Sequence, residues 1–109
     1  MYAIRATYLP REDMHFDRNY YVDKHIPLAQ KRLAGRVHYL QMFAEFDTRV
    51  LMDGDALRSP CVFVLTVATE QDVAAFRKFR RSADCIPLAD DVARYTNCKS
   101  EWTVAEIVA

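Results

Sequence analysis

His25 is the side chain in this sequence that most directly suggests chemistry. An ordinary histidine pKa of about 6.5 lets small changes in surroundings set its charge near neutral pH. Such a group can transfer protons or orient a ligand. It lies within residues 16–33, a stretch that combines a helix start with an amphipathic pattern. The alternative interpretation is a hydrogen-bonded core histidine with no chemical role.

Tyrosines offer a second group for acid–base chemistry beside His25. A phenol from Tyr8, Tyr21 or Tyr39 can donate a proton or stabilise an oxyanion. His25 and Tyr21 are therefore the candidate catalytic residues, and Tyr8, Tyr39 and Asn97 are the candidate ligand-binding residues. Each tyrosine can instead be a core aromatic with a hydrogen-bonded hydroxyl. Asn97 can instead stabilise a turn.

A helix must position His25, and the sequence predicts where that helix begins. Asp17 is a favourable N-cap, and Phe16 and Tyr21 fall at the two ends of a hydrophobic staple. Pro27 cannot donate a hydrogen bond to the preceding turn, so the helix should kink or restart beside His25. At about 100° per residue one face collects the apolar side chains: Tyr21, Val22, His25, Ile26, Leu28, Ala29 and Leu33. His25 should lie near the middle of the buried face.

The other elements follow from alternation, turn residues and helix caps. We expect strands at residues 2–9, 37–47, 61–68 and 101–108, with a hairpin loop at 52–60. We expect helices from Asp17 to before Gly35, from Thr69 to about Arg81, and a short one over 83–94 that Pro87 interrupts. The order β-α-β-β-α-β predicts a single α+β domain over residues 1–109, with a ferredoxin-like antiparallel sheet and both main helices on one face.

The third predicted strand is apolar on both sides. Residues 61–68 read CVFVLTVA, so both alternating sets of side chains are largely apolar, and Tyr39 and Phe43 add to the second face from the preceding strand. Helices can cover only one face of the sheet, and soluble monomers rarely expose a large apolar patch. The sequence therefore predicts a homodimer in which sheet packs on sheet.

Charge and composition exclude several classes of function. Lys+Arg and Asp+Glu are both 15, giving a formal net charge of zero, so no nucleic-acid partner is expected. The cluster Arg77, Lys78, Arg80 and Arg81 is interpreted as the solvated face of a helix. We also expect no membrane span and no signal peptide. The three cysteines, Cys61, Cys85 and Cys98, form no close pair, which predicts reduced thiols, a cytoplasmic location and no metal site.

The segment FDRNYYVDKHIPLA resembles the ethyl tert-butyl ether degradation (EthD) family of dimeric α/β-barrel proteins. The most specific part is the pair Tyr20 and Tyr21 followed by His25, Pro27 and Leu28, which is similar to the pattern Y-Y-x-x-x-H-x-P-L. A weaker second likeness is YTNCKSEWTVAEIV near the end of the chain. The resemblance covers nearly the whole sequence and implies a ferredoxin-like unit that pairs through its sheets, with a ligand pocket between sheet and helices.

Two functions from different classes remain open at this point. The first is a cofactor-free isomerase, cyclase or monooxygenase that acts on a small hydrophobic or aromatic catabolite in an oxidative degradation pathway, with His25 as acid or base. The second is a non-catalytic accessory protein that holds such a molecule, or haem, for a partner oxidase, because one histidine can serve as an axial ligand. Fold alone does not choose between them.

Overall fold

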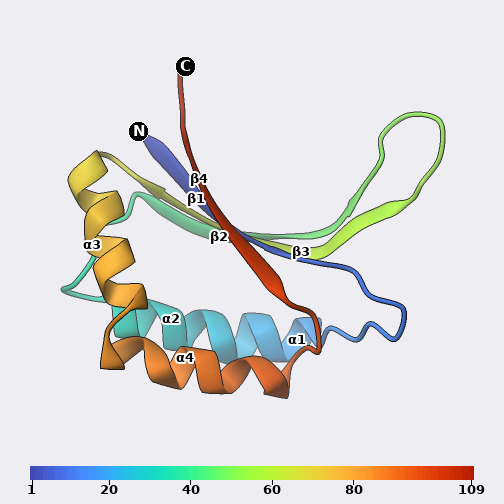
Figure 1. Cartoon of the computed structure of the whole chain (residues 1–109), viewed down its shortest axis with the longest axis horizontal. Coiled ribbons are helices and arrows are strands. Elements are labelled where there is room, and N and C mark those ends of the chain that lie inside the picture. Colours follow the sequence, from blue (N-terminus) through green and yellow to red (C-terminus); the bar gives the residue numbers. More distant parts are fainter.

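The computed structural model describes residues 1–109 and contains one sheet and a layer of helices (Figure 1). The strands are β1 (Tyr2–Tyr8), β2 (Gln41–Arg49), β3 (Leu57–Val67) and β4 (Ser100–Glu106). The helices are α1 (Arg18–Tyr20), α2 (Ile26–Leu33), α3 (Glu70–Arg80) and α4 (Ile86–Asp91). A π-helical turn, Tyr21–His25, joins α1 to α2, and 3₁₀ turns Ala83–Cys85 and Val92–Arg94 flank α4. None of these helices is both long enough and apolar enough to span a lipid bilayer.

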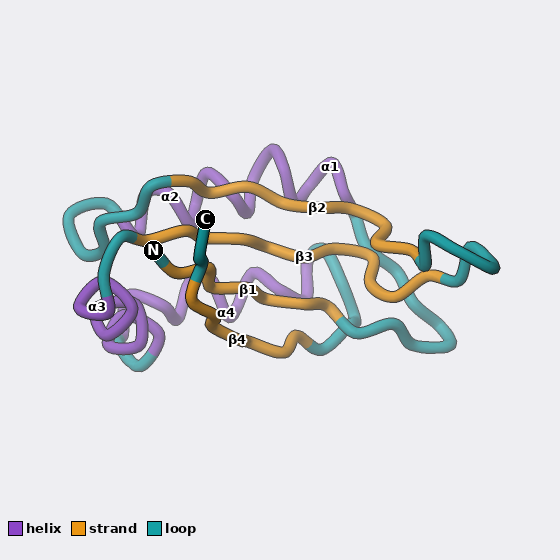
Figure 2. The backbone as a smooth tube through the Cα atoms, turned by 90° about the horizontal axis from the view of Figure 1, so that it is seen from above, coloured by secondary structure: helices purple, strands orange, loops and turns teal.

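The sheet has the order β2-β3-β1-β4, and every neighbouring pair is antiparallel (Figure 2). Ile4 in β1 pairs with Leu65 in β3 and with Val104 in β4, which fixes the register across the centre. The helices lie on one side of this sheet, and the two chain termini lie close together (Figure 1). This arrangement confirms the predicted ferredoxin-like α+β fold.

The segment around His25 is built largely as its sequence predicts. The Asp17 carboxylate accepts a hydrogen bond from the backbone N–H of Tyr20 at 3.0 Å, and the rings of Phe16 and Tyr21 lie 5.2 Å apart. The helix does not break before Pro27. It widens into the π-helical turn, in which the Ile26 N–H donates to the carbonyl of Tyr21. Since Pro27 has no N–H to bond one turn back, the looser turn accommodates it and ends at His25.

The starts of two strands differ from the prediction by four residues each. β2 begins at Gln41 rather than at residue 37, because the Val37 N–H still bonds the carbonyl of Leu33 at the end of α2. β3 begins at Leu57 rather than at residue 61. The Ser59 hydroxyl donates to the carbonyl of Tyr8 at 2.6 Å and ties this early part of β3 to β1.

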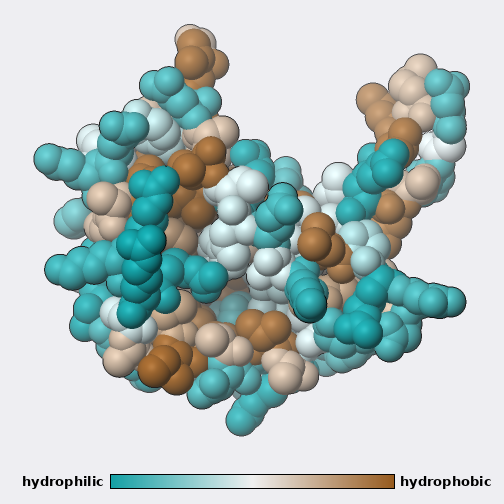
Figure 3. Space-filling model, in the orientation of Figure 1, coloured by the Kyte–Doolittle hydropathy of each residue, from teal (hydrophilic) through white to brown (hydrophobic).

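The loop between β2 and β3 forms the tip of a long hairpin that projects from the body (Figure 1). Asp53 and Gly54 both have positive φ there, +59° and +136°, as the turn residues in the sequence predicted. Figure 3 shows hydrophobic side chains on this arm, where Leu51 is 92% exposed and Met52 67% exposed.

The interior separates into two neighbouring clusters. The larger one contains eleven buried residues, including Ile4, Leu33, Leu65, Phe76 and Phe79, between the sheet and the helices. The smaller one contains Tyr8, Tyr21, Cys61, Tyr95 and Cys98. The larger cluster is aliphatic and phenylalanine-rich with one cysteine, whereas the smaller one carries three tyrosine hydroxyls and two thiols. Polar chemistry inside the fold is therefore concentrated in the second cluster.

Candidate functional site

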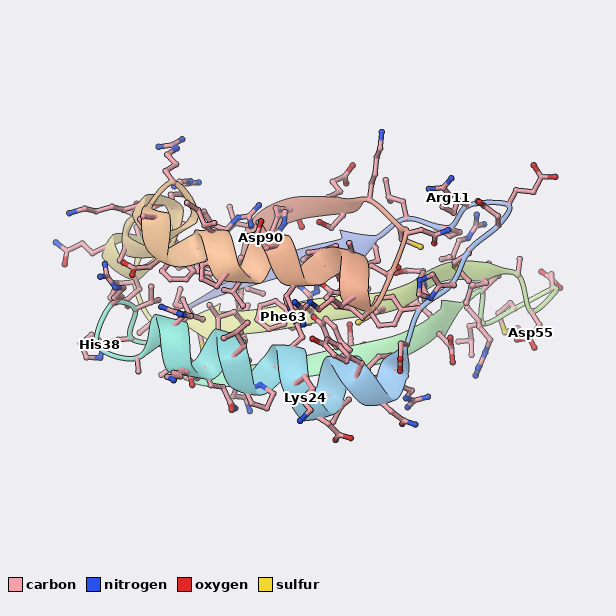
Figure 4. All side chains as sticks on the ribbon, turned by 90° about the horizontal axis from the view of Figure 1, so that it is seen from below. Arg11, Lys24, His38, Asp55, Phe63 and Asp90 are labelled. Atoms are coloured by element: carbon pink, nitrogen blue, oxygen red, sulfur yellow. The ribbon has the colours of Figure 1, made fainter.

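The side chain of His25 lies where two helical segments run side by side beneath the sheet. In Figure 4, the α1–α2 segment and α4 lie next to each other, with Phe63 of the sheet visible between them. The imidazole Nδ1 lies 2.9 Å from Oδ2 of Asp91, the last residue of α4. His25 is 8% exposed and Asp91 is 9% exposed, so their contact is screened little by water.

Two further side chains, besides His25, contact the carboxylate of Asp91. Its Oδ1 accepts a hydrogen bond of 2.7 Å from the Tyr20 hydroxyl, and the Arg94 guanidinium lies 3.8 Å from the same oxygen. Burial acts to raise the pKa of Asp91, but the hydrogen bonds from Tyr20 and His25 outweigh it and hold the pKa below its ordinary value. Asp91 is therefore a carboxylate at neutral pH.

The protonation of His25 follows from its surroundings. Burial lowers the pKa of His25 below its ordinary value of 6.5, and the opposing effect of Asp91 does not cancel this. The imidazole is therefore neutral near pH 7, with a single N–H. Because a carboxylate only accepts hydrogen bonds, the proton belongs on Nδ1, where it donates to Asp91. The lone pair is then on Nε2, which is the arrangement of a general base.

Two phenols lie on the Nε2 side of His25. The Tyr95 hydroxyl is 3.5 Å from Nε2, and the Tyr8 hydroxyl is 2.5 Å from the Tyr95 hydroxyl. Burial raises the pKa of both phenols, so both stay protonated at neutral pH. Tyr21 stacks on the imidazole, with ring centroids 5.2 Å apart and planes 20° apart, and fixes the orientation of the His25 ring.

These groups form part of the wall of a cavity of about 520 Å³ between the sheet and the helices. Fourteen of its eighteen lining residues are hydrophobic. The lining residues are Tyr8, Tyr21, His25, Ala29, Leu33, Phe63, Phe76, Phe79, Arg80, Cys85, Leu88, Ala89, Val92, Tyr95, Cys98, Lys99, Ser100 and Trp102. A volume of several hundred Å³ with a mostly apolar wall and a few convergent polar groups is typical of a small-molecule site.

The structure brings together three of the five residues singled out in the sequence. His25, Tyr21 and Tyr8 line the cavity, whereas Tyr39 and Asn97 do not. Tyr39 precedes β2 and packs against the larger core cluster. The Asn97 side chain accepts from the His15 N–H at 3.0 Å and donates to the carbonyl of Asp13 at 2.8 Å, so it joins two loops. These hydrogen bonds hold two loops together rather than stabilise a local turn.

Sequence reasoning missed three residues of the site: Asp91, Tyr95 and Tyr20. Tyr95 begins the second, weaker family likeness near the end of the chain. That likeness was the sequence signal that could have marked Tyr95 as a site residue. Tyr20 is not on the apolar face that the periodicity defines, yet its hydroxyl reaches Asp91. The sequence alone does not distinguish Asp91 from Asp90. Only the fold shows that Asp91 is buried and that its neighbour Asp90 is exposed.

Two other kinds of chemistry, a cysteine nucleophile and a metal site, find little support among the side chains. Cys61 is fully buried but does not line the cavity. Burial raises the pKa of its thiol to about 12, which disfavours the thiolate that a nucleophile needs. No group of three or more His, Cys, Asp or Glu side chains is placed to hold a metal ion.

The fold and cavity define a ferredoxin-like α+β domain with a mainly apolar pocket and a buried Asp–His pair at its wall. The chain is similar in structure to an EthD-like protein from Ralstonia eutropha JMP134, with a TM-score of 0.73, 23% identity, and coverage of 99% of this chain and 92% of that chain. It is also similar to an EthD family protein from Bacillus halodurans C-125, with a TM-score of 0.58, 17% identity, and coverage of 99% of both chains.

These likenesses show the fold, and both proteins carry the family name that the motif around His25 had suggested. No protein-family model matches the sequence. No curated protein matches it either.

Proposed function

We propose that this chain is an EthD-like protein that binds a small hydrophobic or aromatic molecule in the cavity, where His25 acts as a general base. The observation that carries the proposal is the fixed direction of the imidazole. Asp91 holds Nδ1 at 2.9 Å, and His25 itself lines the cavity. The basic nitrogen Nε2 is thereby left on the side of the Tyr95 and Tyr8 hydroxyls.

The simplest reaction for this arrangement is enolisation of a bound carbonyl compound. Nε2 takes a proton from the carbon next to the carbonyl, the C–H electron pair forms the C=C bond of the enolate, and negative charge develops on oxygen. Asp91 stabilises the imidazolium that forms, since an adjacent carboxylate favours the charged ring. A hydroxyl from Tyr8 or Tyr95 can donate to the developing oxyanion.

Enolisation is the shared first step of isomerisation and of ring closure, and neither needs a cofactor. Return of the proton to a different carbon gives isomerisation, and attack of the carbanion on a second carbonyl gives ring closure. With molecular oxygen as co-reactant, the same carbanion is the species that a cofactor-free monooxygenase oxidises. The proposal therefore places the protein in the degradation of a small hydrophobic catabolite, which is the setting implied by the family resemblance.

Proton exchange tests this function without knowledge of the natural substrate. The probe is 2-tetralone in deuterated buffer, and the measurement is loss of the α-proton NMR signal with and without protein. We expect the wild type to accelerate exchange and His25→Gln to lose about a hundredfold or more of the acceleration. His38→Gln is the control, because His38 is exposed and lies at one end of the molecule, away from Phe63 at the cavity (Figure 4). Equal acceleration by wild type and His25→Gln would refute the role of His25.

A second candidate is binding without catalysis, as an accessory protein that serves a partner oxidase. The observation that favours it is the Tyr95 hydroxyl, 3.5 Å from Nε2, which can satisfy the free nitrogen within the protein. Haem binding through Nε2 would require this hydroxyl to move. Binding of 2-tetralone without accelerated exchange would support the accessory function, and a haem titration that changes the Soret band in wild type but not in His25→Gln would identify haem as the ligand.

We also propose that the functional unit is a homodimer paired through the sheet. No helix covers the outer face of the sheet (Figure 1). Val62, Val64 and Thr66 of β3 lie on this face and are at most 7% exposed, and Phe43 of β2 beside them is 40% exposed. Native mass spectrometry should give a dimer for the wild type and a monomer for Phe43→Glu. Val22→Glu, on an exposed helical position, is the control and should stay dimeric. A monomeric wild type would refute the paired sheets.

A further inference from the structure

We infer that the cavity selects a hydrophobic molecule that carries a carboxylate, with Arg80 and Lys99 at the mouth as the groups that recognise it. This inference rests on the proposed function and names the substrate class of the same site. The charged residues that line the cavity are Arg80 and Lys99, and no Asp or Glu lines it.

Neither of these two cations has an acidic partner within the protein. Six contacts between basic and acidic side chains occur in the molecule, and they use Arg11, Arg18, His25, Arg36, Arg49 and Arg94. Arg80 and Lys99 are also both exposed, whereas His25 and Tyr95 are buried. The cavity therefore has two free positive charges at its solvent side and a neutral, aromatic interior.

Arg80 is held in place although it has no acidic partner. Its guanidinium lies over the ring of Trp102, 4.2 Å from the centroid, and its Nη1 lies 3.8 Å from the Cys85 sulfur. Both neighbours line the cavity. Stacking on an aromatic face restrains the guanidinium plane and leaves its N–H groups available in the plane. A planar fork of donors matches a carboxylate, which it can bind through two parallel hydrogen bonds.

Arg80 differs in this respect from the basic residues around it in the sequence. The cluster at residues 77–81 was interpreted as one solvated helix face, and Arg80 is exposed as that interpretation expects, but it also lines the cavity. Its charge also reaches the interior, because it acts to lower the pKa of Tyr8, although burial prevails and leaves that pKa raised. Lys78 on the same helix is exposed and lines no part of the cavity.

Lys99 has a fixed backbone and a free ammonium group. Its carbonyl accepts a hydrogen bond of 2.8 Å from the Leu9 N–H, just before β4 begins. The side chain can then approach a ligand anion as a mobile point charge, while Arg80 supplies direction. A ligand held in this way has its carboxylate at the mouth and its apolar body inside, toward His25. Two fused aromatic rings fit readily in about 520 Å³.

Three ligands of one shape and different charge test the inference by isothermal titration calorimetry. The probes are 2-naphthoate, 2-naphthamide and 2-naphthamidine, which are anionic, neutral and cationic. We expect wild type to bind the naphthoate about tenfold or more tighter than the amide, and the amidine most weakly. Arg80→Met and Lys99→Met should each reduce the preference for naphthoate over amide, and Lys78→Met should leave it unchanged. Arg80→Lys, which keeps the positive charge, should retain part of the preference for naphthoate over amide.

The outcomes separate the inference from the proposed function. Equal affinities for the three ligands would overturn the carboxylate preference and leave ligand binding in the cavity intact. Absence of binding for all three would refute the apolar binding cavity itself. If Arg80→Met weakens naphthoate and naphthamide equally, Arg80 supports the packing of Trp102 and does not recognise the anion. That result would overturn the inference for Arg80.

Discussion

Asp91 and His25 are 66 residues apart in sequence and lie within 2.9 Å of each other, on two helical segments beneath the same sheet. The pair is anchored from both sides, by the Tyr20 hydroxyl on Asp91 and by the Tyr21 ring stacked on His25. A buried carboxylate of this kind fixes the tautomer and direction of an imidazole. Asp91 is therefore a positioning residue for His25.

Replacement of Asp91 by Asn should weaken the base without removing the imidazole. The amide carries no charge to stabilise an imidazolium, and its NH₂ group can donate to Nδ1 and so favour the wrong tautomer. We expect the exchange of 2-tetralone α-protons to slow by about a hundredfold. The free energy of unfolding should fall by about 2 kcal/mol, since hydrogen bonds to a charged group are lost.

Asp90→Asn is the matched control for this variant. Asp90 is the exposed neighbour of Asp91 on α4, so its replacement makes the same chemical change outside the buried pair. The control should keep both the exchange rate and the stability of the wild type. Equal rates in the two variants would contradict the positioning role of Asp91.

The pH dependence of proton exchange should report the buried imidazole. Only neutral His25 is a base, and burial lowers the pKa of His25 below 6.5. The rate should therefore rise with pH, reach its plateau before neutral pH, and show a midpoint below 6.5. The measurement is the exchange rate of 2-tetralone across a buffer series at constant ionic strength. A midpoint above the ordinary histidine value would contradict the assigned environment.

Stability should depend on pH through the same residue. Because the pKa of His25 is lower in the folded state than in the unfolded state, the unfolded chain binds more protons as the pH falls below about 6.5. The contribution of His25 to the free energy of unfolding is present above that pH. It is lost as the pH decreases toward the pKa of His25 in the folded state. Urea unfolding at one protein concentration should show this loss in wild type and a smaller one in His25→Gln. Identical slopes against pH would show that His25 does not titrate differently in the two states.

Much of the fold was predictable because its signals are local. The capping boxes, alternating strands and turn residues each lie within a few positions of one another. Thr69 and Asp72 form the expected reciprocal cap at the start of α3, and Gly35, with φ of +76°, follows the end of α2. The strand boundaries were less accurate because tertiary contacts set them, as with Ser59 bonded to Tyr8 across two strands.

The site was predictable in part, and the missing part is non-local. His25, Tyr8 and Tyr21 lie on faces that periodicity places toward the interior, and all three line the cavity. Asp91 and Tyr95 reach them only through the packing of α4 and its following turn beside the first helical segment. Tyr39 was expected on a strand, but the end of α2 holds Val37 and delays β2. Tyr39 therefore lies outside the cavity.

Filling the cavity should separate ligand binding from stability. Ala29 on α2 is 6% exposed and lines the cavity, so a larger side chain there would occupy ligand space. We expect Ala29→Phe to bind 2-naphthamide at least about tenfold more weakly, because most of a ligand's surface is buried in such a pocket. Its thermal stability should change little, since the ring enters open volume rather than packed core. Ala74→Phe, on an exposed position of α3 away from the cavity, is the control. Unchanged affinity in a folded Ala29→Phe protein would place the ligand elsewhere, and calorimetric titration of both variants measures the difference directly.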